Sequence, residues 1–142
     1  MNPIFWLLLG GMGVAGASYL YKSWHSRTLK ITSDEEFLRV YSKIYADPAD
    51  LVLQQRLVIA ARLGLPAERL APDLTFRRLS SYTGFAGEYE LGMGDLEDEL
   101  RELFEKASLK VSPSFPASIG ELVHQMATAK GTIHSGILGK SQ

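Results

Sequence analysis

The sequence contains no cysteine and only three histidines among its 142 residues. Without cysteine, the chain has no disulfide framework, no thiolate metal site and no cysteine nucleophile. The histidines, His25, His124 and His134, are far apart and lack the spacing of a metal site. No charge sign is in excess either, since the formal net charge is −1. We therefore expect no nucleic-acid partner, and we predict a protein that is not an enzyme and holds no metal or cofactor.

Residues 1–21 carry no charged side chain, and an apolar run extends from Pro3 to Tyr21. As a helix this run is roughly 28 Å long, about the thickness of one hydrocarbon core. A cleaved signal peptide is the alternative, but it requires positive charge before the apolar run. Here Lys22, Arg27 and Lys30 follow it. The pattern predicts a retained transmembrane helix over 1–21 in the inner (cytoplasmic) membrane, with the N-terminus outside and the rest cytoplasmic.

Small residues are concentrated in the middle of this predicted anchor. Gly11 pairs with Ala15, and Gly13 pairs with Ala17, at the four-residue spacing that lets two membrane helices approach closely. The alternative is that small residues are simply common in membrane helices. The first interpretation predicts a helix partner in the bilayer, either a second copy of the chain or another membrane protein.

A basic linker over 22–32 leads into a region whose pattern is helical throughout. Ser33 and Glu36 form a predicted capping box at the start of the first helix. We expect Asp47 to cap the next helix, with Pro48 at its first position, and Gly64 to end it. A helical turn is expected at 67–70. No strand alternation is evident, so the fold class is all-α: the transmembrane helix followed by a small helical bundle over 33–131.

The second half of the bundle contains two strong helix signals. Asp73 is expected to cap a short turn, and residues 80–90 are expected to form a loop. A helix beginning at Asp95 has Leu96, Leu100, Leu103 and Phe104 on one face. Ser118 and Glu121 form a second capping box, which opens a last helix that we expect to end at Gly131. Residues 132–142 are expected to form a flexible tail.

The order of these features resembles the acyl carrier proteins over residues 50–129. Residues 57–65 resemble the end of that family's first helix, residues 66–76 its long first loop, and residues 118–123 the opening of its last helix. Residues 91–96, Leu-Gly-Met-Gly-Asp-Leu, occupy the place of the family's Leu-Gly-x-Asp-Ser-Leu attachment motif. The resemblance implies the family's helical-bundle fold.

The attachment position departs from the family pattern. Asp95 stands where the family has the serine that carries a phosphopantetheine arm, and Gly94 stands where the family has aspartate. A carboxylate cannot form that phosphodiester, so the resemblance implies a degenerate, carrier-like module without an arm. The other serines weighed for this role lack the family's Asp-Ser-Leu context: Ser80, Ser81, Ser108, Ser112 and Ser114.

Acidic residues are concentrated between Glu88 and Glu105, where eight acids accompany Arg101 as the one basic residue. One interpretation is a solvated helix face whose first turn matches the helix dipole. The other is a docking surface for a basic partner, because the acids continue beyond the reach of the dipole. The candidate partner-binding residues are Asp95, Asp98, Glu99, Glu102 and Glu105. A calcium site is disfavoured, since carboxylates that fan out around a helix do not converge on one ion.

Two further features receive a structural interpretation. His124 accompanies the apolar stripe of the last helix, where a histidine at the edge of the core is expected more often than a catalytic base. Tyr82, Phe85 and Tyr89 in the expected loop indicate a flap over the bundle, with a mobile contact loop as the alternative.

Three functions remain open at this point. The favoured one is a non-enzymatic adaptor, anchored in the inner membrane, whose carrier-like domain docks a basic protein surface. The second is a small structural subunit of a membrane assembly, which includes self-association into a homo-oligomer. The third is a membrane-tethered acyl carrier that is modified at an unorthodox serine.

Overall fold

The computed structural model describes Gly16, Leu20 and residues 28–81, 93–110 and 115–138. Its helices are α2 (Asp34–Tyr41), α3 (Ala49–Leu63), the 3-10 turn η1 (Ala67–Arg69), α4 (Phe76–Ser81), α6 (Met93–Lys106) and α7 (Ile119–Leu138). The described residues contain no β-strand, and only an isolated bridge joins Thr75 to Ser118. The prediction of an all-α chain is confirmed for these residues.

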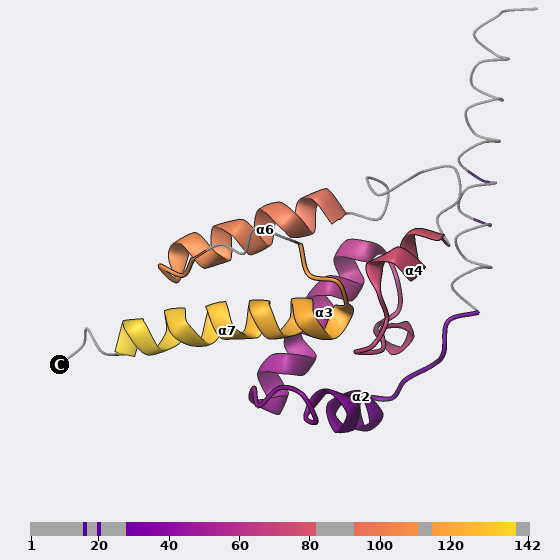
Figure 1. Cartoon of the computed structure of the whole chain (residues 1–142), viewed down its shortest axis with the longest axis horizontal. Coiled ribbons are helices and arrows are strands. Elements are labelled where there is room, and N and C mark those ends of the chain that lie inside the picture. The colour runs from indigo at the N-terminus through magenta and orange to yellow at the C-terminus, as the bar shows by residue number, and fades with distance from the viewer. Residues whose placement is uncertain (1–15, 17–19, 21–27, 82–92, 111–114, 139–142) are drawn as a thin grey trace, which may run out of the picture.

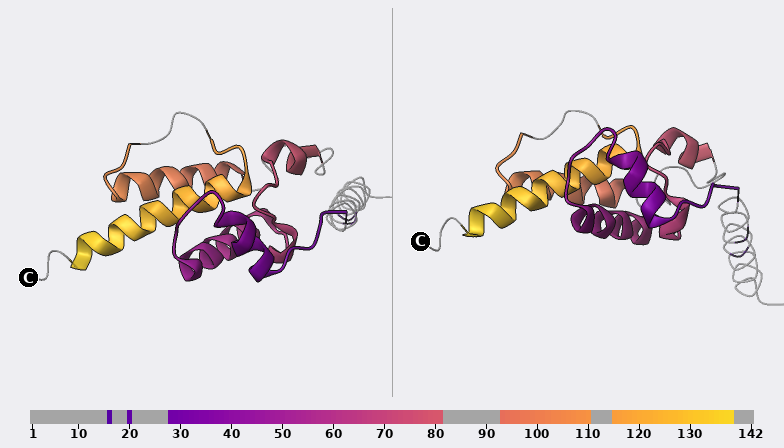
Figure 2. Two further views of the ribbon diagram at one scale, coloured as in Figure 1. Left: turned by 60° about the horizontal axis from the view of Figure 1, so that its bottom comes forward. Right: turned by 90° about the horizontal axis from the view of Figure 1, so that it is seen from below.

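The three longest helices form the centre of the bundle. α7 packs against both α3 and α6, and α2 packs against α3 (Figure 1). α6 and α7 lie side by side and run in the same direction in all views (Figure 2). The fully buried side chains Phe37, Ile59 and Met126 represent the contributions of α2, α3 and α7 to a single core.

The predicted membrane anchor falls outside the described residues, apart from Gly16 and Leu20. The small-residue pairs Gly11–Ala15 and Gly13–Ala17 fall outside them as well. Within the described part of the chain, no helix has both the length and the apolar character needed to cross a bilayer.

Both predicted capping boxes are present in part. Ser33 Oγ accepts a hydrogen bond from Glu36 N at 3.2 Å, and Ser118 Oγ accepts one from Glu121 N at 3.2 Å. The two glutamate carboxylates do not return to the capping residue. Glu36 binds Lys30 instead, and Glu121 accepts from the backbone amide of Ala117. The serines therefore cap as predicted, while each glutamate ties down the chain that precedes its helix.

Gly64 ends α3 as predicted, because its backbone lies in the left-handed region (φ 63°) that glycine adopts without steric cost. The predicted turn after it is the 3-10 turn η1. Two other predicted caps are wrong. α3 begins at Ala49 after Pro48, so Asp47 lies one residue too early to cap it. The short helix α4 is capped by Thr75, whose Oγ1 accepts from Arg78 N at 3.2 Å, and not by Asp73.

α7 continues to Leu138, so the predicted end at Gly131 and the predicted tail from 132 are wrong for residues 132–138. A glycine inside a helix costs only about 1 kcal/mol relative to alanine. Thr132 and Ser135 donate their hydroxyls to carbonyls one turn earlier, which satisfies these groups within the helix. The predicted loop over 80–90 also begins later, because Ser80 and Ser81 belong to α4.

A short seam joins the start of α7 to the segment before α4. Phe76 N donates to Ala117 O, Ile119 N to Leu74 O, and Gly120 N to Pro72 O, at 2.9–3.1 Å. A Cβ on Gly120 would lie 2.8 Å from the Pro72 carbonyl oxygen, closer than atoms approach. Only glycine at 120 therefore allows this approach of the two chain segments.

Candidate functional sites

The amphipathic helix α6 carries the predicted acidic surface. Leu96 and Leu100 are buried, and Leu103 and Phe104 pack against the core. On the opposite side, Asp95, Asp98, Glu102 and Glu105 recur at helical spacing and are exposed, and we call these four residues the acidic stripe. The stripe spans about 15 Å of helix. Gly94 and Asp95 lie in the first turn of α6, and Asp95, which the sequence resemblance compares with the attachment serine, is exposed.

Ion pairs divide the acids of α6 into two groups. Glu97 pairs with Arg101 at 3.3 Å and Glu102 with Lys106 at 2.6 Å, both along the helix. The hydrogen bond from Lys106 lowers the pKa of Glu102. Asp95, Asp98 and Glu105 form no ion pair with any residue in the described ranges.

Glu99, another candidate partner-binding residue, has a role within the fold. Its carboxylate accepts a hydrogen bond from Arg62 Nε of α3 at 3.1 Å, and its side chain is 25% exposed. This pair joins α6 to α3. The structure thus places Glu99 beside the acidic stripe but commits its charge to an intramolecular contact.

A second polar cluster lies where the start of α3 meets α7. Asp47 Oδ2 accepts a hydrogen bond from the Tyr41 hydroxyl and contacts His124 Nδ1, both at 2.6 Å. The Tyr45 ring stacks on the His124 ring with centroids 4.3 Å apart. Burial and the bond to Asp47 raise the pKa of Tyr41, so its hydroxyl stays protonated. His124 is half-buried at the edge of the core, as its sequence position indicates.

This cluster contains the aspartate–histidine pair of many hydrolases but lacks an arrangement for nucleophilic catalysis. A triad requires a hydroxyl or thiol within hydrogen-bond distance of the second ring nitrogen. No described residue makes that contact, and the Tyr41 hydroxyl is committed to Asp47. The cluster joins α2 and the loop before α3 to α7. The sequence analysis named Asp47 only as a helix cap. It missed the contact of Asp47 with His124 because the two residues lie 77 positions apart.

A shallow groove lies beside this polar cluster. Asp47, Pro48 and Leu51 form one wall, and the second half of α7 forms the other, with small side chains from Ala127 to Gly136. Thr132 and Ser135, which line it, direct their hydroxyl hydrogens to the backbone of α7 itself. The groove therefore presents few polar groups that are available to bind a ligand.

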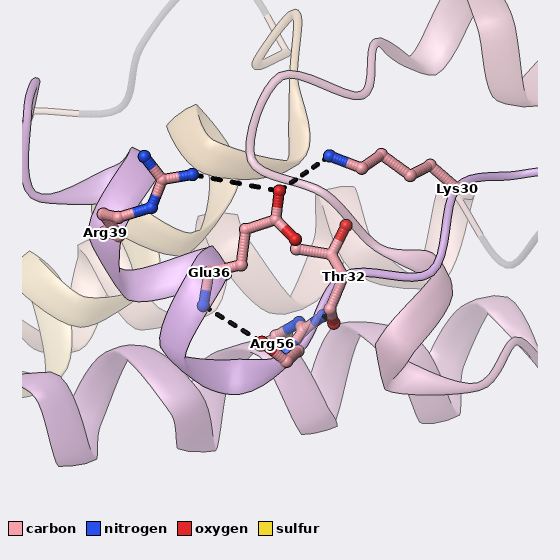
Figure 3. A network of polar contacts seen from close by, with 6 residues as sticks. Lys30, Thr32, Glu36, Arg39 and Arg56 are labelled. Carbon is pink, nitrogen blue, oxygen red and sulfur yellow. Dashed lines mark hydrogen bonds and ion pairs between the residues drawn. The ribbon is translucent and has the colours of Figure 1, made fainter.

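The third polar group is the buried guanidinium of Arg56, whose side chain is 1% exposed. It donates to Thr32 O at 2.7 Å, to Leu70 O at 3.2 Å and to the Asp34 carboxylate at 2.5 Å. It also lies 4.4 Å from the centre of the Phe37 ring. Burial lowers the pKa of Arg56, and the charge of Asp34 opposes that effect. Figure 3 shows Arg56 below Thr32, with Lys30 and Arg39 both directed at Glu36.

The remaining candidates divide between described and undescribed residues. Ser108 lies in the turn after α6, with its backbone in the left-handed region (φ 56°). Ser112 and Ser114 and the loop aromatics Tyr82, Phe85 and Tyr89 fall outside the described residues. Among the residues that the structure describes, no group of three or more histidine or acidic side chains could hold a metal ion.

Comparison with protein-family models, with curated proteins and with solved structures finds no match to this chain. The case for a function rests on the charge and geometry of the chain itself.

Proposed function

We propose that this chain is a non-enzymatic adaptor, anchored in the inner membrane by residues 1–21, that docks a basic partner protein through α6. The observation that carries the proposal is the division of α6 into a buried apolar face and the exposed acidic stripe. Carboxylates gathered on one face of a helix attract a basic surface and fix the orientation in which the partner binds. The anchor is supported by the uncharged apolar run from Pro3 to Tyr21.

The ion pairs identify which carboxylates are best placed to receive a partner. Asp95, Asp98 and Glu105 have no intramolecular ion pair to give up among the described residues, whereas Glu99 would have to leave Arg62. A partner that binds Asp95, Asp98 and Glu105 forms new ion pairs and breaks none among the described residues. We therefore assign the main contact to these three residues, with Glu102 between them on the stripe.

Neutralising these three carboxylates tests the proposal. The stripe variant carries Asp95→Asn, Asp98→Asn and Glu105→Gln in the full-length chain. The matched control carries Glu35→Gln, Asp50→Asn and Asp73→Asn, which remove three exposed carboxylates from other parts of the bundle. Both variants change the net charge equally, so a difference between them reports the position of the charge.

Affinity purification from native membranes is the measurement. We expect a partner to accompany the wild type and the control, and to be lost or weakened with the stripe variant. The remaining binding should depend less on salt, because fewer charges face the partner. Equal recovery with all three proteins would show that the stripe is only solvated. Recovery of the chain alone, with self-association that depends on concentration, would favour the structural-subunit function.

A further inference from the structure

The segment that enters the bundle, residues 28–32, is fastened to it along its length. Leu29 and Thr32 are 4% and 2% exposed. Thr32 N donates to Glu68 O at 2.7 Å, and Thr32 O accepts from Arg56. Arg69 donates to Leu29 O at 2.5 Å. We call residues 28–32 the entry segment.

These contacts make the entry segment part of the bundle instead of a flexible tether. Releasing it would expose the Leu29 side chain and remove the partner of the buried Arg56 guanidinium at Thr32 O. A buried donor that loses its acceptor destabilises the fold, and does so more when it is charged. The entry segment therefore moves with η1 and α3 as one body.

The entry segment also fixes which end of the bundle faces the N-terminal part of the chain. It lies at one end of the bundle, and the C-terminal end of α7 lies at the other (Figures 1 and 2). α6 runs along α7, away from the entry segment. From Tyr21 to Thr28 the chain can reach at most about 25 Å, even fully extended.

We propose that the bundle rests with its entry end on the lipid surface, so that Ile31 and Lys30 contact a bilayer that contains anionic headgroups. This inference depends on the anchor of the proposed function. Ile31 is 61% exposed between neighbours that are held in place, and the Lys30 side chain, which pairs with Glu36 at 2.7 Å, remains 73% exposed. An apolar side chain beside a cation suits the interface of an anionic leaflet. The same orientation keeps the acidic stripe away from a surface of like charge. Of the three acids beside the entry segment, in the first turn of α2, Asp34 pairs with Arg56 and Glu36 pairs with Lys30.

The absence of cysteine allows a direct test, since one introduced cysteine gives one label on the full-length chain. Ile31→Cys reports the entry end, and Ser135→Cys, an exposed position on α7, is the matched control. Both proteins are labelled with the same fluorophore. They are then placed in vesicles of phosphatidylcholine and phosphatidylglycerol that contain a headgroup-attached quencher.

We expect severalfold stronger quenching at position 31 than at position 135. Insertion of a flexible Gly-Ser linker between Arg27 and Thr28 should bring the two positions to the same level, because it frees the bundle without altering it. Equal quenching in the original chain would overturn the orientation while leaving the anchor intact. Vesicle flotation reads the anchor separately: if the chain does not float with the vesicles, both the anchor and the orientation are wrong.

Discussion

Gln55 and Arg56 are consecutive residues of α3, and both side chains are buried. They differ in whether their polar groups have hydrogen-bond partners. Arg56 has a partner for its Nε and for both terminal nitrogens. The amide nitrogen and oxygen of Gln55 are buried with no hydrogen-bond partner within the described structure. Two polar side chains at the same depth thus differ in whether their hydrogen-bonding groups have partners.

The difference in hydrogen bonding follows from the backbone segments that lie beside each face of α3. Consecutive helical residues point about 100° apart, so Arg56 and Gln55 face different neighbours. Arg56 meets Thr32 and Leu70, which lie outside helices and have carbonyl oxygens free to accept. α3 also packs on α6 and α7, where the interior carbonyls are already bonded within their own helices. The Arg56 guanidinium is satisfied because it faces the chain entry at Thr32 and the turn at Leu70.

Replacing Arg56 by methionine should have the largest effect. The variant leaves two buried carbonyl oxygens without a donor and removes the contact with the Phe37 ring. We expect the free energy of unfolding to fall by about 3 kcal/mol or more. Urea denaturation of the full-length chain in detergent, followed by circular dichroism, measures it. A variant as stable as the wild type would show that the Arg56 contacts contribute no net stability.

The same substitution one residue earlier, Gln55→Met, should change stability in the other direction. Methionine has a similar shape and carries no group that needs a hydrogen bond. We expect the free energy of unfolding to rise by about 1 kcal/mol or more. The two methionine variants are each other's control in the same denaturation experiment. A loss of stability at position 55 would mean that the Gln55 amide has a partner after all.

Thr32→Val makes the same comparison between the satisfied backbone and the unsatisfied side chain of a single residue. The backbone of Thr32 is bonded at both its amide and its carbonyl, but its buried Oγ1 has no partner. Valine keeps the shape and removes only the hydroxyl, so we expect a gain of about 1 kcal/mol. Thr32→Ser, which keeps the hydroxyl, should give no such gain. Thermal unfolding of both variants distinguishes a polar effect from a change in packing.

The smallest effect is expected at Glu36, which lies in the first turn of α2 and pairs with Lys30 of the entry segment. The hydrogen bond and charge of Lys30 lower the pKa of Glu36 below its ordinary value of 4.5. The ionised carboxylate therefore stabilises the fold above that pH, and the contribution is lost as the pH falls through the lowered pKa. Glu36→Gln should reduce the melting temperature slightly at neutral pH.

In acid below the lowered pKa of Glu36, the wild type and Glu36→Gln should melt alike. Glu35→Gln is the control, because Glu35 lies in the same first turn of α2 and forms no ion pair with any described residue. A pH dependence shared by both variants would assign the effect to the helix dipole instead of to Lys30.

Local signals in the sequence predicted three helix boundaries correctly and failed at Asp47, Asp73 and Gly131, where tertiary packing or the helix itself decides. The serine caps at 33 and 118 and the stop at Gly64 depend on residues within one turn, and all three are confirmed. The buried face of α6 followed from its periodicity. Such features need no knowledge of the tertiary structure.

The sequence could not reveal interactions between distant segments. Arg56 and Arg62 look alike in the sequence, as two basic residues of one helix. In the fold one is buried in a network and the other forms a half-exposed pair with Glu99. Asp47 precedes a proline, as a helix cap does, yet its carboxylate binds α2 and α7. Which partner a polar side chain finds is decided by tertiary packing.

The seam between the start of α7 and the segment before α4 has a consequence for how the chain folds. Thr75 and Ser118 meet although 43 residues separate them. Closing so long a loop costs entropy before any contact repays it. Helical domains with mostly local contacts fold quickly, and contacts of high sequence separation slow the search. We expect the docking of α7 on this seam to limit the folding rate, so that Gly120, which permits the approach, governs kinetics as well as packing.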